Sequence, residues 1–311
     1  MTKSKKKQRR WILAFLILFG AGFLLLYFFI PRIITDIRNP IFAVLRNNQE
    51  ESASTNFEEN SSKGKYLNFI TTDGLKLTSY LTYSSRDTTF GTIILVHGIR
   101  SYKEHFIELS EYLSEQGFNS VAIDLRAHGQ SEGTHCTFGV KEKEDISTLI
   151  DTLEKQEGIS QCIGIWGQSL GGAIALQAMG SDKRIQYGII ESTFSDLNSI
   201  TNDYFKNKIG FSFKIFTDYL VYRAGKIAEF DPQEASPLLY CSKIEQPILL
   251  IHGNQDKRIN IKYAKANFSQ IKSPKKELCI IEGANHLNVW QIGGIQYFDK
   301  IISFIKSNAN N

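Results

Sequence analysis

From residue 91 onwards, the sequence alternates short apolar runs with longer segments whose apolar residues recur at helical spacing. The apolar runs are GTIILVHG, FNSVAIDL, CIGIWG, IQYGIIES, PILLIHG and ELCIIEG, and such runs are typical of strands buried on both faces of a parallel sheet. The segments predicted to be helices are residues 103–116, 141–157, 170–179, 261–271 and 290–307. This alternation predicts an α/β fold with a mostly parallel sheet and helices on both of its faces.

Two segments depart from the alternation. Before it, the β-rich runs KYLNFITT and LKLTSYLTY are separated by Asp73 and Gly74, a dipeptide that predicts an antiparallel hairpin. Within it, residues 195–240 are rich in aromatic side chains, contain no strand-like run and are predicted to be helical. We expect this segment to form a helical cap over one edge of the sheet, in a single domain that spans residues 65–307.

The first 30 residues differ in character from the rest of the chain. Residues 1–10 contain six Lys or Arg and no acidic residue, and residues 11–30, which begin with Trp11 and end with Ile30, are 20 residues without a charge. Twenty helical residues span about 30 Å, the thickness of the hydrocarbon layer of a bilayer. A cleavable signal peptide is the alternative, but its apolar region is shorter and ends at a small-residue cleavage site. The run therefore predicts an uncleaved transmembrane anchor.

The charge distribution around the anchor predicts its orientation. By the positive-inside rule, the basic tail stays in the cytoplasm and the domain after residue 31 is extracytoplasmic. Because the tail adjoins the anchor, its expected partners are anionic lipid headgroups rather than nucleic acid. Residues 31–64 include the polar run NNQEESASTNFEENSSKGK and are predicted to be a solvated juxtamembrane tether.

The four cysteines show no C-x-x-C spacing, which argues against a zinc site or a thioredoxin-type site. Cys136 and Cys241 lie in predicted loops, where an oxidising compartment could join them in a disulfide. The sequence does not determine whether the two residues are close enough to do so.

The stretch IWGQSLGGA places Ser169 between Gly167 and Gly171. Glycines two positions before and after a serine remove the Cβ atoms that would collide across a sharp strand-to-helix turn. The helix predicted to begin at Leu170 directs its amino-terminal N–H groups towards the serine. Since the strand and the helix that this motif requires are both predicted here, Ser169 is the candidate nucleophile.

A nucleophilic serine needs a base, and the chain contains six histidines. His286 follows the last predicted strand, at the sheet edge where the carboxyl ends of the strands meet, and is the candidate base. The other five lie in turns, in a loop or on a helix, where structural roles are expected for most of them: His97, His105, His128, His135 and His252.

An acid should orient the imidazole of the base. Asp256 follows the preceding strand, on the same edge of the sheet as His286, and is the candidate acid. Asp124 and Glu191 each follow another strand and are the alternatives. Asp124 is expected to pair with Arg126 two residues later, whereas Glu191 stays open.

These residues occur in the order serine, acid, histidine, and the sequence resembles the α/β-hydrolase-fold serine hydrolases. It is similar to their serine aminopeptidase S33 and monoacylglycerol-lipase-like branch. The similarity covers residues 65–307 and is carried by LVHGIRSYKEHF, AIDLRAHGQSEG, GIWGQSLGG, ESTFSDL, PILLIHGNQDKRI and EGANH. The loop HGIR departs from the HGGG of the hormone-sensitive-lipase type.

The resemblance implies a role for each of these residues. Ser169 would be the nucleophile, Asp256 the acid and His286 the base. The oxyanion hole would consist of the backbone N–H groups of Ile99 and Leu170.

The expected function is hydrolysis of an ester, amide or thioester through an acyl-enzyme, with no metal or organic cofactor. The aromatic cap favours an apolar or lipid-like acyl substrate, although the same side chains would also serve to pack the cap on the core. Two other functions stay open: acyl transfer by the same three residues, and binding by a catalytically inactive hydrolase fold.

Overall fold

The computed structural model describes residues 3–38, 63–160 and 162–309. At its centre is an eight-stranded sheet with the strand order β1-β2-β4-β3-β5-β6-β7-β8. The strands β1 (Gly64–Ile70) and β2 (Lys76–Thr82) form an antiparallel hairpin whose turn contains Gly74 at a φ of 87°. This hairpin is the one that Asp73 and Gly74 predicted.

The other six strands run parallel to one another, and β2 joins them by pairing antiparallel with β4. They are β3 (Thr92–Val96), β4 (Asn119–Ile123), β5 (Ile163–Gln168), β6 (Ile185–Glu191), β7 (Ile248–Gly253) and β8 (Lys276–Ile281). Each of these strands coincides with an apolar run of the sequence, so the predicted α/β fold with a mostly parallel sheet is confirmed.

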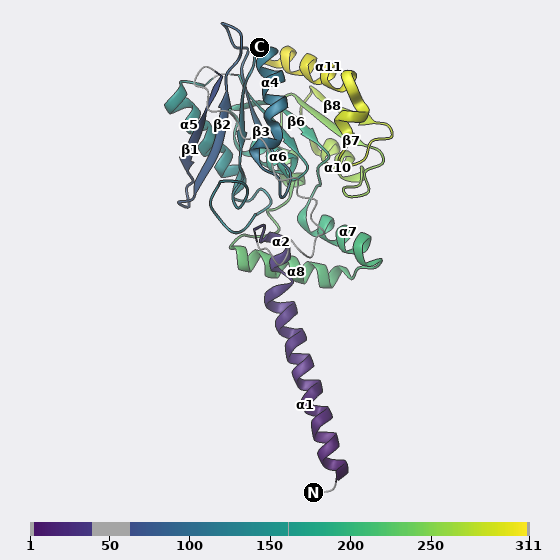
Figure 1. Ribbon diagram of the computed structural model, residues 1–311. Coiled ribbons are helices and arrows are strands. Elements are labelled where there is room, and N and C mark those ends of the chain that lie inside the picture. Colours follow the sequence, from purple (N-terminus) through teal and green to yellow (C-terminus); the bar gives the residue numbers. More distant parts are fainter. Residues whose placement is uncertain (1–2, 39–62, 161, 310–311) are drawn as a thin grey trace.

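Helices cover both faces of the sheet (Figure 1). On one face lie α5 (Glu142–Glu157), α6 (Leu170–Ser181), α9 (Pro237–Cys241) and α10 (Lys262–Gln270). On the other lie α4 (Ile107–Glu115), preceded by the 3-10 turn η2 (Lys103–Phe106), and α11 (Val289–Ala309), which has a non-helical break at Gly294. The apolar side chains of the strands divide between these two layers, giving one hydrophobic core on each face of the sheet.

The cap consists of α7 (Leu197–Ile209) and α8 (Lys214–Ala228), which lie between the sheet and the N-terminal helix (Figure 1). The third helix of the predicted cap segment, α9, packs on α6 instead. A Cβ atom added to Gly180 of α6 would lie 2.8 Å from the Cβ of Tyr240 in α9. The small residues of α6 therefore bring α9 into the layer that covers the sheet.

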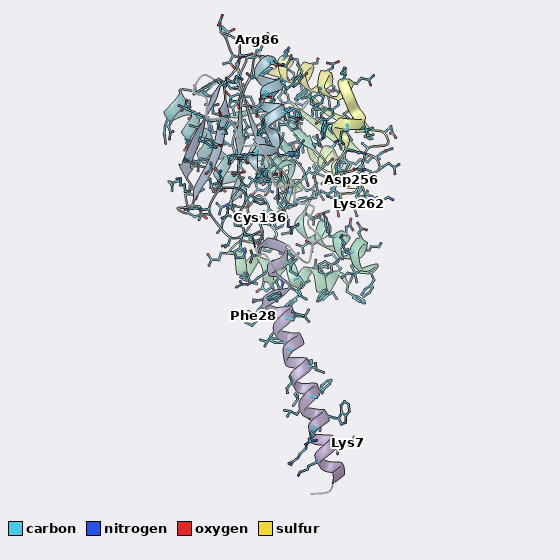
Figure 2. The ribbon with its side chains drawn as sticks, in the orientation of Figure 1. Lys7, Phe28, Arg86, Cys136, Asp256 and Lys262 are labelled. Atoms are coloured by element: carbon cyan, nitrogen blue, oxygen red, sulfur yellow. The ribbon has the colours of Figure 1, made fainter. Side chains whose placement is uncertain are left out.

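The N-terminal segment is a long helix, α1 (Lys3–Leu24), followed by a π-helical turn, η1 (Leu25–Phe29), and a short helix, α2 (Arg32–Thr35). Figure 2 shows Lys7 near the free end of this segment and Phe28 where it meets the domain. Among the described residues, the stretch Lys6–Thr35 is the one helix long and apolar enough to cross a membrane.

The segment predicted to be a solvated tether is in part attached to the domain. Thr35 and Ile37 are buried, and Asp36 forms a β-bridge with His135. The sequence did not indicate this contact, because the partner of Asp36 lies 99 positions further along the chain. The rest of the predicted tether, residues 39–62, lies outside the described residues. All four cysteines, Cys136 and Cys241 included, are free thiols.

Candidate active site

Ser169 occupies the sharp turn between β5 and α6, with a φ of 55° and a ψ of −114°. A residue other than glycine in this region of φ is strained, so the surrounding structure must impose the conformation. A Cβ on Gly167 would lie 2.2 Å from the carbonyl oxygen of Gly171, and a Cβ on Gly171 would lie 1.9 Å from that of Val96. Both glycines are thus required by the close approach of α6 to β3 and β5.

The structure brings Ser169, His286 and Asp256 together from three different loops. The Oγ of Ser169 lies 3.1 Å from Nε2 of His286, and Nδ1 of His286 lies 2.7 Å from Oδ2 of Asp256. An Nδ1–H that donates to the carboxylate leaves Nε2 unprotonated, and Nε2 then accepts the hydrogen bond of the serine hydroxyl. This arrangement suits Nε2 to take up the hydroxyl proton.

Asp256 is held in position by the backbone around it. Its side chain is buried, and Oδ1 accepts the N–H groups of Arg258 and Ile259, each at 2.8 Å. A second imidazole, that of His252, lies 3.5 Å from Oδ2 but has its Nε2 2.8 Å from the carbonyl oxygen of Ile259. Burial lowers the pKa of His252, so this ring is a neutral support beside the carboxylate.

The alternative acid Glu191 has a different partner. It is buried and accepts a hydrogen bond from the hydroxyl of Tyr297 in α11. Burial raises the pKa of Glu191, whereas the hydrogen bond from Tyr297 lowers it. Glu191 therefore ties β6 to α11 rather than orienting His286.

The other alternative acid, Asp124, does not pair with Arg126, and that prediction is wrong. Asp124 accepts hydrogen bonds from the backbone N–H and the Nζ of Lys103, at 2.7 Å and 2.8 Å. Arg126 pairs with Asp145 of α5 and with Asp73 of the hairpin turn. Neither partner is close in sequence, so local pairing was the wrong inference.

Two further histidines are buried supports, as expected. Nε2 of His97 accepts the N–H of Leu125 at 3.2 Å, and Nδ1 of His128 lies 2.9 Å from the carbonyl oxygen of Arg126. Burial lowers the pKa of His97 to about 4 and that of His128 to about 3, so both rings are neutral near pH 7.

An apolar cavity of about 200 Å³ opens beside Ser169. Ile99 and Leu170 both line it. Leu170 is the first residue of α6, so its N–H has no carbonyl partner within the helix. The loop that carries Ile99 passes close to the serine, since a Cβ on Gly98 would lie 3.4 Å from the Cβ of Ser169. Residues from two segments, Ile99 and Leu170, therefore lie beside the cavity that Ser169 lines.

The remaining walls of this cavity come from three parts of the chain. The cap contributes Leu197, Ile200, Thr201, Tyr204 and Phe205, loops contribute Arg100, Phe138, Phe194 and Ile259, and α2 contributes Ile33 and Ile34. Ile33 and Ile34 were not among the site residues predicted from the sequence. Their one signal was apolar character in the first part of a segment whose later part is polar.

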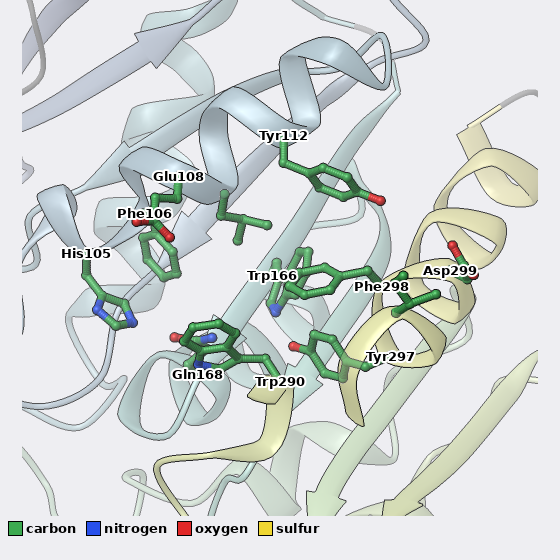
Figure 3. Close-up of a pocket in the computed structure, with 12 residues that line it drawn as sticks. His105, Phe106, Glu108, Tyr112, Trp166, Gln168, Trp290, Tyr297, Phe298 and Asp299 are labelled. Carbon is green, nitrogen blue, oxygen red and sulfur yellow. The ribbon is translucent and has the colours of Figure 1, made fainter. Parts of the chain in front are cut away.

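A second cavity, of about 410 Å³, lies between α4 and α11 on the other face of the sheet (Figure 3). Its lining is largely aromatic and includes Trp166, Trp290, Tyr297 and Phe298. Gln168, which directly precedes Ser169 in the sequence, also lines this cavity.

An eight-stranded, mostly parallel sheet with a serine on the turn after β5, and with an acid and a histidine after β7 and β8, defines an α/β hydrolase. Comparison with known proteins agrees with this class. Residues 87–220 match the family model of the serine aminopeptidases, S33. The chain has the α/β-hydrolase fold.

Individual relatives extend over most of the chain. It is 27% identical over 251 residues to the uncharacterized protein YfhR of Escherichia coli O157:H7, which covers 78% of this chain and 81% of that protein. It is 24% identical over 255 residues to the uncharacterized peptidase YuxL of Bacillus subtilis, covering 78% of this chain and 38% of that one.

Among solved structures, the esterase Pf2001 of Pyrococcus furiosus is similar with a TM-score of 0.65 and 25% identity, over 79% of this chain and 92% of that chain. The matches place this chain among esterase-like and peptidase-like hydrolases.

Proposed function

We propose that this chain is a membrane-anchored serine hydrolase that cleaves an ester, amide or thioester bond through an acyl-enzyme on Ser169. The observation that carries this proposal is the continuous hydrogen-bonded series from Ser169 through His286 to Asp256, beside an apolar cavity.

Each group has a defined part in the proposed reaction. Nε2 of His286 takes the proton of Ser169 as Oγ attacks the substrate carbonyl, and Asp256 stabilises the imidazolium that forms. The N–H groups of Ile99 and Leu170 hold the oxyanion, and removing one such donor typically costs about 3–4 kcal/mol. His286 then protonates the leaving group, and a water molecule releases the acyl group by the same route in reverse.

The lining of the cavity favours an apolar acyl group, because its side chains are almost all aliphatic or aromatic. The names of the relatives, an esterase and a peptidase, support ester and amide bonds as the reacting groups. We place the catalytic domain outside the cytoplasm, because the basic residues precede the apolar helix.

The test is active-site labelling of the full chain in detergent with a fluorophosphonate, together with hydrolysis of p-nitrophenyl esters. The wild-type chain should be labelled and should hydrolyse the esters, and Ser169→Ala should do neither. Ser192→Ala is the matched control, because Ser192 is a buried serine that follows the neighbouring strand β6. Equal labelling of Ser169→Ala and the wild type would refute the proposal. Product analysis with an added alcohol separates hydrolysis from acyl transfer.

A further inference from the structure

The cavity beside Ser169 is completed by the segment that follows the apolar helix. Ile33 and Ile34 of α2 form part of its wall, together with Tyr204 and Phe205 of the cap. The end of the candidate anchor and the reacting serine are therefore parts of one site, rather than two sites joined by a flexible chain.

Several hydrogen bonds fix this segment to the domain. Nη2 of Arg38 donates to the carbonyl oxygens of His128, Gly129 and Ser131, at 3.2 Å and 3.0 Å for the first two. The carbonyl oxygen of Thr35 accepts the N–H of Cys136 at 2.9 Å. These contacts hold α2 in a fixed position between the apolar helix and the cavity.

The cap lies at the same level as the end of the apolar helix. The guanidinium carbon of Arg223 in α8 is 3.7 Å from the ring centroid of Tyr27 in η1. Figure 1 shows α8 running across the domain end of α1, with α2 beside it. A bilayer spanned by α1 would therefore have its outer surface next to α8.

The hairpin between α7 and α8 exposes a series of large apolar side chains, which we call the cap edge. It consists of Ile209, Phe211, Phe213 and Ile215, with exposed fractions of 54%, 60%, 68% and 88%. Three lysines, Lys206, Lys208 and Lys214, lie within three positions of these residues in the sequence. Apolar side chains flanked by lysines are the composition of a surface that enters the interface of an anionic bilayer.

We propose that the cap edge inserts into the outer interface of the bilayer that α1 spans, and that the Ser169 cavity takes the acyl chain of a membrane-resident lipid from this interface. The acyl chain would enter between α2 and the cap, both of which contribute apolar side chains to the cavity wall. The identity of the substrate rests on the proposed hydrolase function, whereas insertion of the cap edge does not.

The insertion is tested with the full chain in vesicles of phosphatidylethanolamine and phosphatidylglycerol. An environment-sensitive dye is attached at Ile215→Cys, and in a control variant at Arg86→Cys, at the opposite end of the domain (Figure 2). The chain without an added cysteine gives the background. The dye at position 215 should emit at shorter wavelength and be quenched by spin-labelled lipid, while the dye at position 86 should not. Equal access of aqueous iodide to both dyes would overturn the insertion. A dye at position 215 that is shielded from iodide but not quenched by spin-labelled lipid would also overturn it, because this is the result expected if the cap edge binds a second copy of the chain.

The substrate is tested by presenting the same p-nitrophenyl ester group once in the bilayer and once in solution. In the double variant Phe213→Ser and Ile215→Ser, hydrolysis of p-nitrophenyl palmitate embedded in the vesicles should fall by roughly tenfold or more. Hydrolysis of soluble p-nitrophenyl acetate should be unchanged. Ile295→Ser, at a 79% exposed position on α11, is the matched control and should change neither rate.

The two proposals fail in different ways. Equal palmitate rates for the wild type and the double variant would overturn the delivery of substrate from the bilayer. Absence of acetate hydrolysis by the wild type would instead contradict the proposed hydrolase function, and the dye measurement would still decide the insertion.

Discussion

Adding one methyl group at Gly171 tests whether the contact between α6 and β3 sets the geometry of the serine turn. The new Cβ would lie 1.9 Å from the carbonyl oxygen of Val96, and real Cβ atoms essentially never come closer than 3.0 Å. The helix must therefore move by about 1.1 Å, the difference between these two distances. Overpacking of this kind costs about 1–3 kcal/mol, and the better helix propensity of alanine returns up to about 1 kcal/mol.

We expect Gly171→Ala to lower the free energy of unfolding by about 1–2 kcal/mol and ester turnover about a hundredfold, because a shift near 1 Å misplaces the reacting groups. The assays are urea unfolding and steady-state hydrolysis of p-nitrophenyl acetate. Gly172→Ala is the control on the same helix, since a Cβ added there would lie 3.0 Å from its nearest neighbour, the Cβ of Thr193. Wild-type turnover in Gly171→Ala would refute the argument.

Three further predictions concern the supports of the site. Asp256→Asn should lower kcat of ester hydrolysis about 10³–10⁴-fold, because an amide favours the wrong imidazole tautomer; steady-state kinetics measure this loss. Lys103→Met should lower the free energy of unfolding in urea by about 3–5 kcal/mol, since it leaves the buried carboxylate of Asp124 without its cation. The pKa values of His97 and His128, about 4 and about 3, lie below the ordinary 6.5, so stability present above pH 6.5 is lost on acidification. The free energy of unfolding in urea should be lower at pH 5 than at pH 7 by about 2 kcal/mol for each ring. A free energy of unfolding that does not change between these pH values would contradict the assignment of both rings as neutral in the folded state.

The sheet could be predicted from the sequence because each of its parallel strands is a continuous apolar run between segments of helical periodicity. A strand that is buried on both faces needs apolar residues at successive positions, which is the pattern seen. The hairpin was predictable because the dipeptide Asp73-Gly74 is typical of a hairpin turn. The place of α9 could not be predicted in this way. It is set by the fit of Tyr240 against Gly180, a contact between residues 60 positions apart.

The candidate site was predictable to the extent that it depends on strand ends. Ser169, Asp256 and His286 each follow a strand, and parallel strands bring such positions to one edge of the sheet. The partners of Asp124 and Arg126 could not be predicted, because they come from η2, α5 and the hairpin turn. The contribution of α2 to the cavity was missed for a similar reason. The hydrogen bonds of Arg38 that hold α2 go to carbonyl groups about 90 positions further on, and carbonyl groups carry no sequence signal.

The attachment of α2 determines where the chain can be shortened. A soluble version that begins at β1 would lack Ile33 and Ile34, and would expose the cavity beside Ser169 to water on that side. A version that begins at Pro31 would keep this wall and the hydrogen bonds of Arg38, while removing the apolar helix. Where biochemists would ordinarily remove everything before the first strand, the segment that directly follows the apolar helix thus supplies part of the cavity wall beside Ser169.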